Sequence, residues 1–207
     1  MKNRKRMTAV ILAAITAVSL TACSGSAGQS AASSSDGGAS AGEESYKIGV
    51  LQYATHGSLD NCYEGLLLGL EEEGLIEGQN LEVEFQNARN DTGNSDMIAK
   101  NMVAEQVDLF VGIATPAAMS GYSAAKDTDI PVVFTAVSDP VSTGLVQSLE
   151  TPGTNCTGTS DVLPLEEQVK MIRAFLPDAD TIGIIYTTSE PNSISQLETL
   201  KSIAPEY

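Results

Sequence analysis

Segments with the hydrophobic pattern of strands alternate along the chain with segments that have the pattern of helices. Apolar runs rich in strand-forming residues are typical of buried strands, and they occupy residues 46–53, 107–114 and 130–137. Residues 81–88 alternate between apolar and polar positions, which also predicts a strand. Segments with helical spacing fall between them, at 59–74, 91–106 and 116–126. In the first of these helices Leu59, Tyr63, Leu66 and Leu70 share one face, and Gly74 follows as a stop. Alternating strands and helices predict an α/β fold with a parallel sheet covered on both faces.

The pattern changes after Asp139, where Gly, Thr and Ser become frequent and only a short strand is expected, at 155–159. An amphipathic helix is predicted at 165–177, with Val169, Ile172 and Leu176 facing inward. The run TIGIIYTTSE at 181–190 predicts a strong strand, and a last helix is expected at 192–204, for which Asn192 or Ser193 offers a cap.

These elements divide the chain into a first α/β lobe at 46–160 and the start of a second α/β lobe at 161–207. A single strand with its helices cannot make a sheet or a core of its own. We therefore expect the second lobe to be truncated, because TIGIIYTTSE restarts the pattern of YKIGVLQYAT. The alternative is that 161–207 packs onto the first lobe.

The N-terminal residues predict export. Residues 1–22 combine a basic start with an apolar run too short to span a bilayer, and LTAC ends the run at Cys23. Small residues before a cysteine resemble a bacterial lipoprotein signal, which implies a chain lipidated at Cys23. Alternatives are an ordinary secretory signal or a short membrane anchor. Residues 23–45 lack large apolar side chains and predict a flexible tether. We expect an extracytoplasmic protein, lipid-anchored to the cell membrane.

The charge balance constrains the partners. The chain carries 11 Lys and Arg against 27 Asp and Glu, a net charge of −16, which disfavours nucleic acid and anionic lipid headgroups. Cations for an anionic ligand are scarce, so a bound carboxylate would depend on backbone N–H groups at helix starts.

Such helix starts occur where two predicted strands end, at Thr115-Pro116 and at Ser138-Asp139-Pro140. Ligands of parallel α/β sheets bind outside the carboxyl ends of the strands. Pro116 suits the first turn of a helix, which would leave the N–H groups of Ala117 and Ala118 available to a carboxylate. The alternative is a plain strand-to-helix turn capped by Thr115.

Other candidate groups have structural alternatives. Asp139 and Asp161 follow apolar stretches, where either would accept an ammonium group or simply form a turn. Cys62 and Cys156 are interpreted as small buried hydrophobes, although an exported protein also allows a disulfide. His56 is the only histidine, and its place in a GSLD turn favours a structural or surface role. No cofactor or metal is expected, because no catalytic or phosphate-loop motif and no clustered metal ligands appear.

A family resemblance covers residues 46–207. In this order, IGVLQ, HGSLD, GLLLGLEEEGLIEGQNLEVEFQNA, DLFVGIATPAA, IPVVFTAVSDPVSTGLV, PGTNCTGTSD and IGIIYTTSEPNS resemble the ABC-transporter substrate-binding lipoproteins of the tryptophan/tyrosine type. The resemblance implies a periplasmic-binding-protein type I-like fold, in which ligand binds between two doubly wound lobes joined by a hinge. It also implies an aromatic amino acid as ligand, with an ABC permease and its ATPase as partners. The family's second lobe is longer, so we expect weak or absent closure around the ligand.

The resemblance also implies a set of pocket residues. Tyr53 would stack on the ligand, Thr115, Pro116 and Ala117 would hold its carboxylate, and the remaining residues would complete the pocket from both lobes. The full set is Gln52, Tyr53, Thr115, Pro116, Ala117, Asp139, Ser160, Asp161, Ser189, Glu190, Asn192 and Ser193. Gly57 and Met119 depart from residues common in the family, which bears on the ligand more than on the fold.

The sequence thus favours a non-enzymatic protein that captures a small amino acid-like solute and delivers it to a permease. An extracytoplasmic sensor domain of the same fold is one alternative, although a lipid anchor lacks the spanning helix that a sensor needs. An α/β enzyme is the other.

Overall fold

A computed structural model describes residues 45–207. The predictions for the signal at 1–22, for lipidation at Cys23 and for nearly all of the tether at 23–45 concern residues outside this range. Within it, no helix is long and apolar enough to cross a membrane.

The centre of the fold is a parallel, five-stranded sheet with the strand order β2-β1-β3-β4-β5. Its strands are β1 (Tyr46–Gln52), β2 (Leu81–Asn87), β3 (Leu109–Ile113), β4 (Val132–Val137) and β5 (Cys156–Ser160). Each strand lies within two residues of its predicted place, and the parallel sheet is confirmed.

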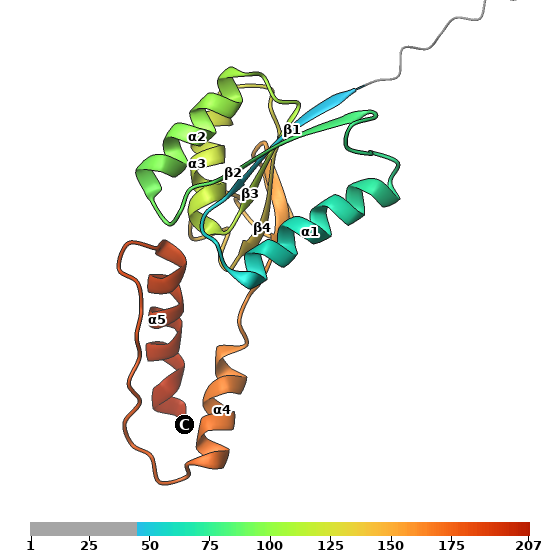
Figure 1. Cartoon of the computed structure of the whole chain (residues 1–207). Coiled ribbons are helices and arrows are strands. Elements are labelled where there is room, and N and C mark those ends of the chain that lie inside the picture. Colours follow the sequence, from blue (N-terminus) through green and yellow to red (C-terminus); the bar gives the residue numbers. More distant parts are fainter. Residues whose placement is uncertain (1–44) are drawn as a thin grey trace, which may run out of the picture. The chain divides into compact units, whose positions relative to one another are not determined.

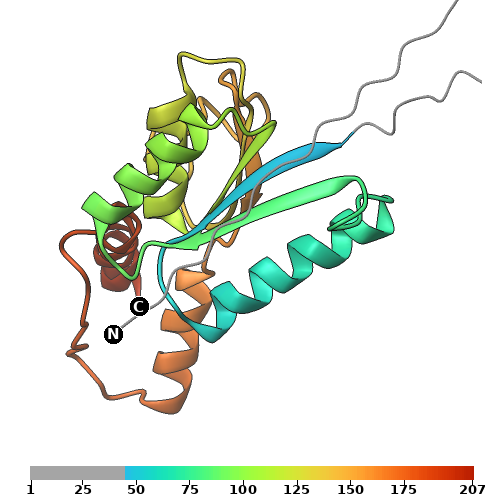
Figure 2. The same ribbon diagram turned by 45° about the horizontal axis from the view of Figure 1, so that its top comes forward.

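Helices cover both faces of the sheet, as Figures 1 and 2 show. α1 (Gly57–Glu72) lies on one face, and α2 (Thr92–Ala104) with α3 (Thr115–Ala125) lies on the other. The face under α2 and α3 holds the larger core, in which Leu51, Met102 and Phe110 are fully buried. The face under α1 has a smaller core built from alternate strand residues such as Val50, Val111 and Ile113.

The strand alternation also separates the two cysteines. Cys156 belongs to the core under α2 and α3, whereas Cys62 packs from α1 against the core on the opposite face. Both thiols are free. The interpretation as small buried hydrophobes holds for Cys156, whose burial raises its pKa to about 12, whereas Cys62 is only half-buried. A sheet between them prevents a disulfide, since Cα atoms more than about 7 Å apart cannot be bridged.

Two helix starts differ from the sequence expectation. α2 was expected to begin at residue 91, but Asp91 is its cap: Asp91 Oδ1 accepts a hydrogen bond of 2.6 Å from Asn94 N–H, and the helix begins at Thr92. α3 is preceded by Ala114 and has no side-chain cap, so the alternative of a turn capped by Thr115 is wrong.

Beyond β5 the chain forms α4 (Leu165–Phe175) and α5 (Pro191–Ile203), followed by a 3-10 turn, η1 (Ala204–Glu206). Val169 is buried and Ile172 is half-buried as expected, but Leu176 is largely exposed. The strand predicted at 181–190 is wrong. Residues 179–187 have no regular secondary structure and pair with no strand of the described chain, and a strand without a partner is not a sheet.

Candidate functional site

Unusual backbone conformations gather at the carboxyl edge of the sheet. Among the described residues, positive φ angles away from glycine occur after β2 at Arg89 and Asn90, after β3 at Ala114 (78°) and near the end of β4 at Ala136 (55°), with only Gln106 elsewhere. Such conformations cost about 1–3 kcal/mol each and cluster at ligand clamps. The pairing of β4 with β5 shifts register around Ala136, the signature of a bulge.

The strain at Ala114 positions the first turn of α3. Ala114 N–H donates to Thr135 O (3.0 Å), and Ala118 N–H donates to Ala114 O (3.0 Å). The expectation that Ala118 N–H stays available was therefore wrong, because it makes the first i to i−4 bond of the helix. The N–H groups of Thr115 and Ala117 have no acceptor among the described residues, and the Thr115 hydroxyl is buried without a partner.

Unpaired donors at this place are unusual. Thr115 is only 1% exposed and Ala117 0% exposed, while more than nine in ten buried backbone N–H groups in proteins are paired. An uncapped helix N-terminus carries partial positive charge and suits an anion. Pro116 removes a donor at the second helical position without cost.

Gln52 ends the neighbouring strand β1 and is also buried. Its Nε2 donates to Ala54 O (2.8 Å) and to Asp60 Oδ1 (2.7 Å), and its Oε1 is a buried acceptor without a donor among the described residues. Tyr53 is 6% exposed, lies in the larger core and places its hydroxyl 3.2 Å from Thr92 Oγ1. The Tyr53 ring thus packs inside the lobe in this structure.

His56 has the structural role expected for it. Its Nδ1 accepts a hydrogen bond of 3.2 Å from Ser58 N–H and so caps the start of α1.

Asp139 is engaged on both carboxylate oxygens. Oδ1 accepts from Ser142 N–H (2.9 Å), and Oδ2 accepts from the Ser195 hydroxyl on α5 (2.9 Å). Burial alone would raise the pKa of Asp139, but these hydrogen bonds outweigh it and hold the pKa below its usual value. Asp139 therefore closes its own turn and joins it to α5.

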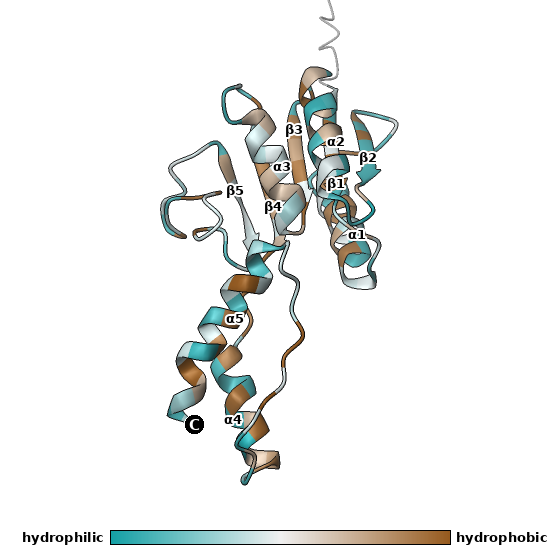
Figure 3. Ribbon diagram, turned by 90° about the vertical axis from the view of Figure 1, so that its left-hand side faces the viewer, coloured by the Kyte–Doolittle hydropathy of each residue, from teal (hydrophilic) through white to brown (hydrophobic). Residues whose placement is uncertain are grey.

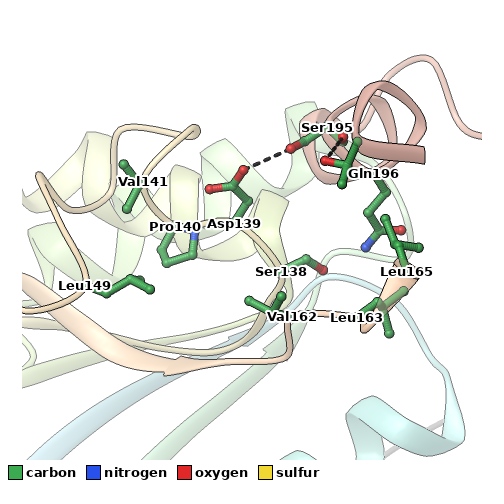
Figure 4. Close-up of a pocket in the computed structure, with 11 residues that line it drawn as sticks. Ser138, Asp139, Pro140, Val141, Leu149, Val162, Leu163, Leu165, Ser195 and Gln196 are labelled. Atoms are coloured by element: carbon green, nitrogen blue, oxygen red, sulfur yellow. Dashed lines mark hydrogen bonds between the residues drawn. The ribbon is translucent and has the colours of Figure 1, made fainter. Parts of the chain in front are cut away.

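A hollow of about 170 Å³ adjoins this hydrogen bond. Figure 4 shows it between the loop after β4, the segment after β5 and α5. The walls are mainly apolar, with Val141, Leu149, Val162 and Leu163 partly exposed, and Asp139 is the only member of the predicted pocket set that lines it.

The other predicted residues lie along the connection and at the start of α5. Ser160 ends β5 and Asp161 follows it, and both are exposed. Glu190 precedes α5 in an extended conformation, Asn192 keeps a buried Oδ1 without a partner, and the Ser193 hydroxyl accepts from Thr187 N–H (2.9 Å).

Ser189 is exposed and makes no hydrogen bond within the described residues.

The structure brings some of this set together. Gln52 is the register partner of Ile113, so β1 and β3 end side by side just before Tyr53 and Thr115. Asp161 N–H donates to Val137 O, which ties the start of the connection to the end of β4.

Sequence reasoning missed Asp60, which orients Gln52, Ser195, which binds Asp139, and the strained Ala114. Asp60 and Ser195 lie near the starts of helices that were predicted, but no local pattern identifies their partners. Nothing in the composition around Ala114 signals a positive φ. No group of potential metal ligands occurs among residues 45–207.

Comparison with known proteins places this geometry in a family. Residues 47–207 match the family of ABC transporter substrate-binding proteins. The chain is similar to the tyrosine-binding protein of Clostridioides difficile (strain R20291), with 40% identity over 205 residues that make up 99% of this chain and 58% of the relative.

Two solved structures illustrate the similarity in sequence and in fold. The ABC domain from Streptococcus pneumonia in complex with L-Trp has 44% sequence identity and a TM-score of 0.75, over 79% of this chain and 54% of that one. The leucine-binding protein of Thermotoga maritima is similar in fold alone, with 15% identity and a TM-score of 0.61 over 78% of this chain and 46% of that one.

The chain thus spans between about half and three fifths of the length of the family members it resembles in sequence. Its parallel sheet and its similarity to these structures establish a periplasmic-binding-protein type I-like α/β fold. On this evidence the chain belongs to the family of ABC transporter substrate-binding proteins.

Proposed function

We propose that this chain is the extracytoplasmic substrate-binding component of an ABC importer and that it captures an aromatic amino acid. Residues 46–160 would form the first lobe and residues 161–207 the start of the second. Lipidation at Cys23 would hold the protein at the membrane, where an ABC permease and its ATPase would receive the ligand. The Tyr-binding and L-Trp-bound relatives support an aromatic amino acid as ligand.

The unpaired donors at the first turn of α3 are the observation that supports this proposal most strongly. A ligand carboxylate at this turn would accept from the N–H groups of Thr115 and Ala117 and from the Thr115 hydroxyl. Hydrogen bonds to a charged group contribute about 1.5–3 kcal/mol each. A binding protein can therefore hold an anion here without arginine, in keeping with a net charge of −16.

The ammonium group of the ligand fits Asp161 better than Asp139. Both oxygens of Asp139 already accept hydrogen bonds from Ser142 and Ser195, whereas the Asp161 side chain is exposed and accepts none within the described residues. Gln52, held by Asp60, would offer its unpaired Oε1 as a further acceptor. Tyr53 and Pro116 would shape the first-lobe side, and Ser160 would lie beside Asp161.

From the second lobe, the start of α5 would face the ligand. We include in this part of the pocket the residues Ser189, Glu190, Asn192 and Ser193. The buried, unpaired Oδ1 of Asn192 supports their inclusion.

The experiment is a two-dimensional amide NMR titration of the full chain in a mild non-ionic detergent. This titration detects ligand binding even when the dissociation constant is millimolar. Adding L-Trp or L-Tyr should shift the Thr115 and Ala117 amide signals, and L-tryptophanamide, which lacks the carboxylate, should not. Replacing Thr115 with valine should weaken L-Trp binding about tenfold or more, the effect of one charged hydrogen bond.

Thr157→Val is the matched control, because Thr157 lies on the exposed part of β5. Saturating L-Trp and L-Tyr that leave the Thr115 and Ala117 signals in place would refute the proposed site. Equal binding of L-Trp and its amide would refute the carboxylate assignment.

A further inference from the structure

Gln52 is a polar side chain enclosed at the end of an apolar strand. Alternation along β1 places it on the same face as Ile48 and Val50, under α1, and it is 1% exposed. The neighbouring strand β3 has the sequence LFVGI and is hydrophobic along its length in Figure 3, so it offers the amide no polar side chain. A buried amide needs partners for two donor hydrogens and for its oxygen, because an unpaired polar group in a protein interior is costly.

The start of α1 provides a partner for the amide nitrogen. His56 caps this helix, and Asp60 N–H donates to His56 O (2.9 Å), which fixes Asp60 in the first turn. Asp60 Oδ1 accepts from Gln52 Nε2 (2.7 Å), and Ala54 O accepts from the same nitrogen (2.8 Å). Both donor hydrogens of the amide are therefore used, and every residue involved belongs to the first lobe.

These two hydrogen bonds determine which way the amide points. In the opposite orientation Gln52 Oε1 would face Asp60 Oδ1 and Ala54 O, and no hydrogen would lie between these acceptors. The nitrogen is thus held towards α1, and the oxygen is left as the only group of the amide that can recognise another molecule.

The oxygen has no donor within residues 45–207, although it is buried. The polar register partner on β2 is Asn87, whose Nδ2 donates to Thr55 Oγ1 (3.4 Å) and whose Oδ1 accepts from Arg89 N–H (2.8 Å). Gln52 lies at the carboxyl edge of the sheet, where β1 and β3 end side by side, and ligands of parallel sheets bind at this edge.

We propose that Asp60 is a positioning residue that holds the Gln52 amide with its oxygen towards the ligand, so that the site selects a ligand with an N–H donor. The inference rests on the proposed function and refines the chemistry of that same site. L-Trp carries two such donors, its α-ammonium group and its ring N–H. The ammonium group is the nearer donor to a carboxylate held at Thr115, because the two groups share one carbon atom. A site that accepts a hydrogen bond from its substrate rejects the analogue that lacks the donor.

Two matched ligand pairs test this selection by amide NMR titration of the full chain in mild detergent. Indole-3-propionate lacks the ammonium group of L-Trp, and 3-(benzothiophen-3-yl)-L-alanine has sulfur in place of the ring N–H. For each pair, the dissociation constant of the analogue is divided by that of L-Trp. In Asp60→Ala the ratio for indole-3-propionate should fall about tenfold, the effect of one hydrogen bond to a charged group, and the benzothiophene ratio should stay the same. A fall in the benzothiophene ratio instead would support the role of Asp60 and identify the ring N–H as the donor.

Further variants separate positioning from a merely structural role, which would weaken both ligands of a pair alike. Asp60→Asn keeps an oxygen that accepts from Gln52 Nε2, so the ratio should stay within about threefold of its original value. Gln52→Met should lower the ratio by itself, and adding Asp60→Ala should lower it no further, because the two residues act as one unit. Glu64→Ala removes an exposed carboxylate one turn further along α1 and should leave the ratio unchanged.

Two results would overturn the inference, and they are distinguishable. Ratios that Asp60→Ala changes in neither pair would show that Gln52 Oε1 binds water or nothing that the ligand supplies, and the proposed function would stand. Failure of the unaltered chain to bind L-Trp at all would refute the proposed function and this inference together.

Discussion

Gly112 lies in β3 where the strand passes beneath the start of α3, and its replacement by alanine tests how tightly the candidate site is packed. A Cβ at this position would lie 2.5 Å from Ala118 Cα and 2.7 Å from Ala118 N. These are backbone atoms, so no side-chain rotation relieves the contact. The alanine must push the first turn of α3 away from the sheet.

The magnitude follows from two opposing effects. Adding a methyl group to a well-packed core costs about 1–3 kcal/mol, and a clash with backbone belongs at the upper end. Replacing glycine with alanine in regular structure returns about 0.5–1 kcal/mol through the entropy of the unfolded chain. We therefore expect Gly112→Ala to lower the free energy of unfolding by about 2 kcal/mol.

Urea unfolding of the full chain, followed by circular dichroism, measures this change. The midpoint should fall by about 1 M at an unchanged slope, since slopes of about 1–3 kcal/mol/M are typical. Gly69→Ala is the control, because its Cβ on α1 meets no atom within 4 Å, and it should be neutral or stabilising by up to about 1 kcal/mol. A Gly112→Ala protein as stable as the original would refute the close packing of α3 on β3.

Two further changes test polar contacts described by the structure. The buried Ser95 hydroxyl on α2 donates to Ser120 Oγ on α3 (2.9 Å), and Ser120→Ala removes this acceptor. Urea unfolding should show that the free energy of unfolding falls by about 1–3 kcal/mol, the cost of an unsatisfied buried polar group. Asp139→Asn tests the lowered pKa of Asp139. A carboxyl group whose pKa is lower in the folded than in the unfolded protein stabilises the fold at pH values above its unfolded pKa of about 4. That contribution is lost as the pH falls through the folded pKa. Thermal melts between about pH 5 and pH 2 should therefore show a smaller acid-induced loss in the variant than in the original, and parallel losses would contradict the role given to the Ser195 contact.

Sequence patterns predicted the first lobe well because each of its strands is both locally strand-like and flanked by partners. The apolar run of β3 and the alternation of β2 are satisfied by neighbours in the same sheet. TIGIIYTTSE has an equally strong local preference, yet the segment forms no strand because pairing is a property of two segments. Local propensity therefore identified what Ile182 and Ile184 favour, but not what lies beside them.

The candidate site was predictable in outline only. That Thr115 and Asp139 follow strands comes directly from the sequence, and topology then places both at the carboxyl edge of the sheet. The left-handed backbone at Ala114 and the contact between Asp139 and Ser195 depend on tertiary packing across many intervening residues. Short-range patterns carry no signal for either.

The position of β1 has a mechanical consequence. β1 is hydrogen-bonded in parallel to β2 on one side and to β3 on the other, and its first residue is Tyr46. Tension that arrives through the chain before Tyr46 acts along the strand axis, so the hydrogen bonds on both sides are sheared together instead of being peeled apart one by one. A pull on the chain before Tyr46 should therefore be resisted by two neighbouring strands at once, without unravelling the sheet.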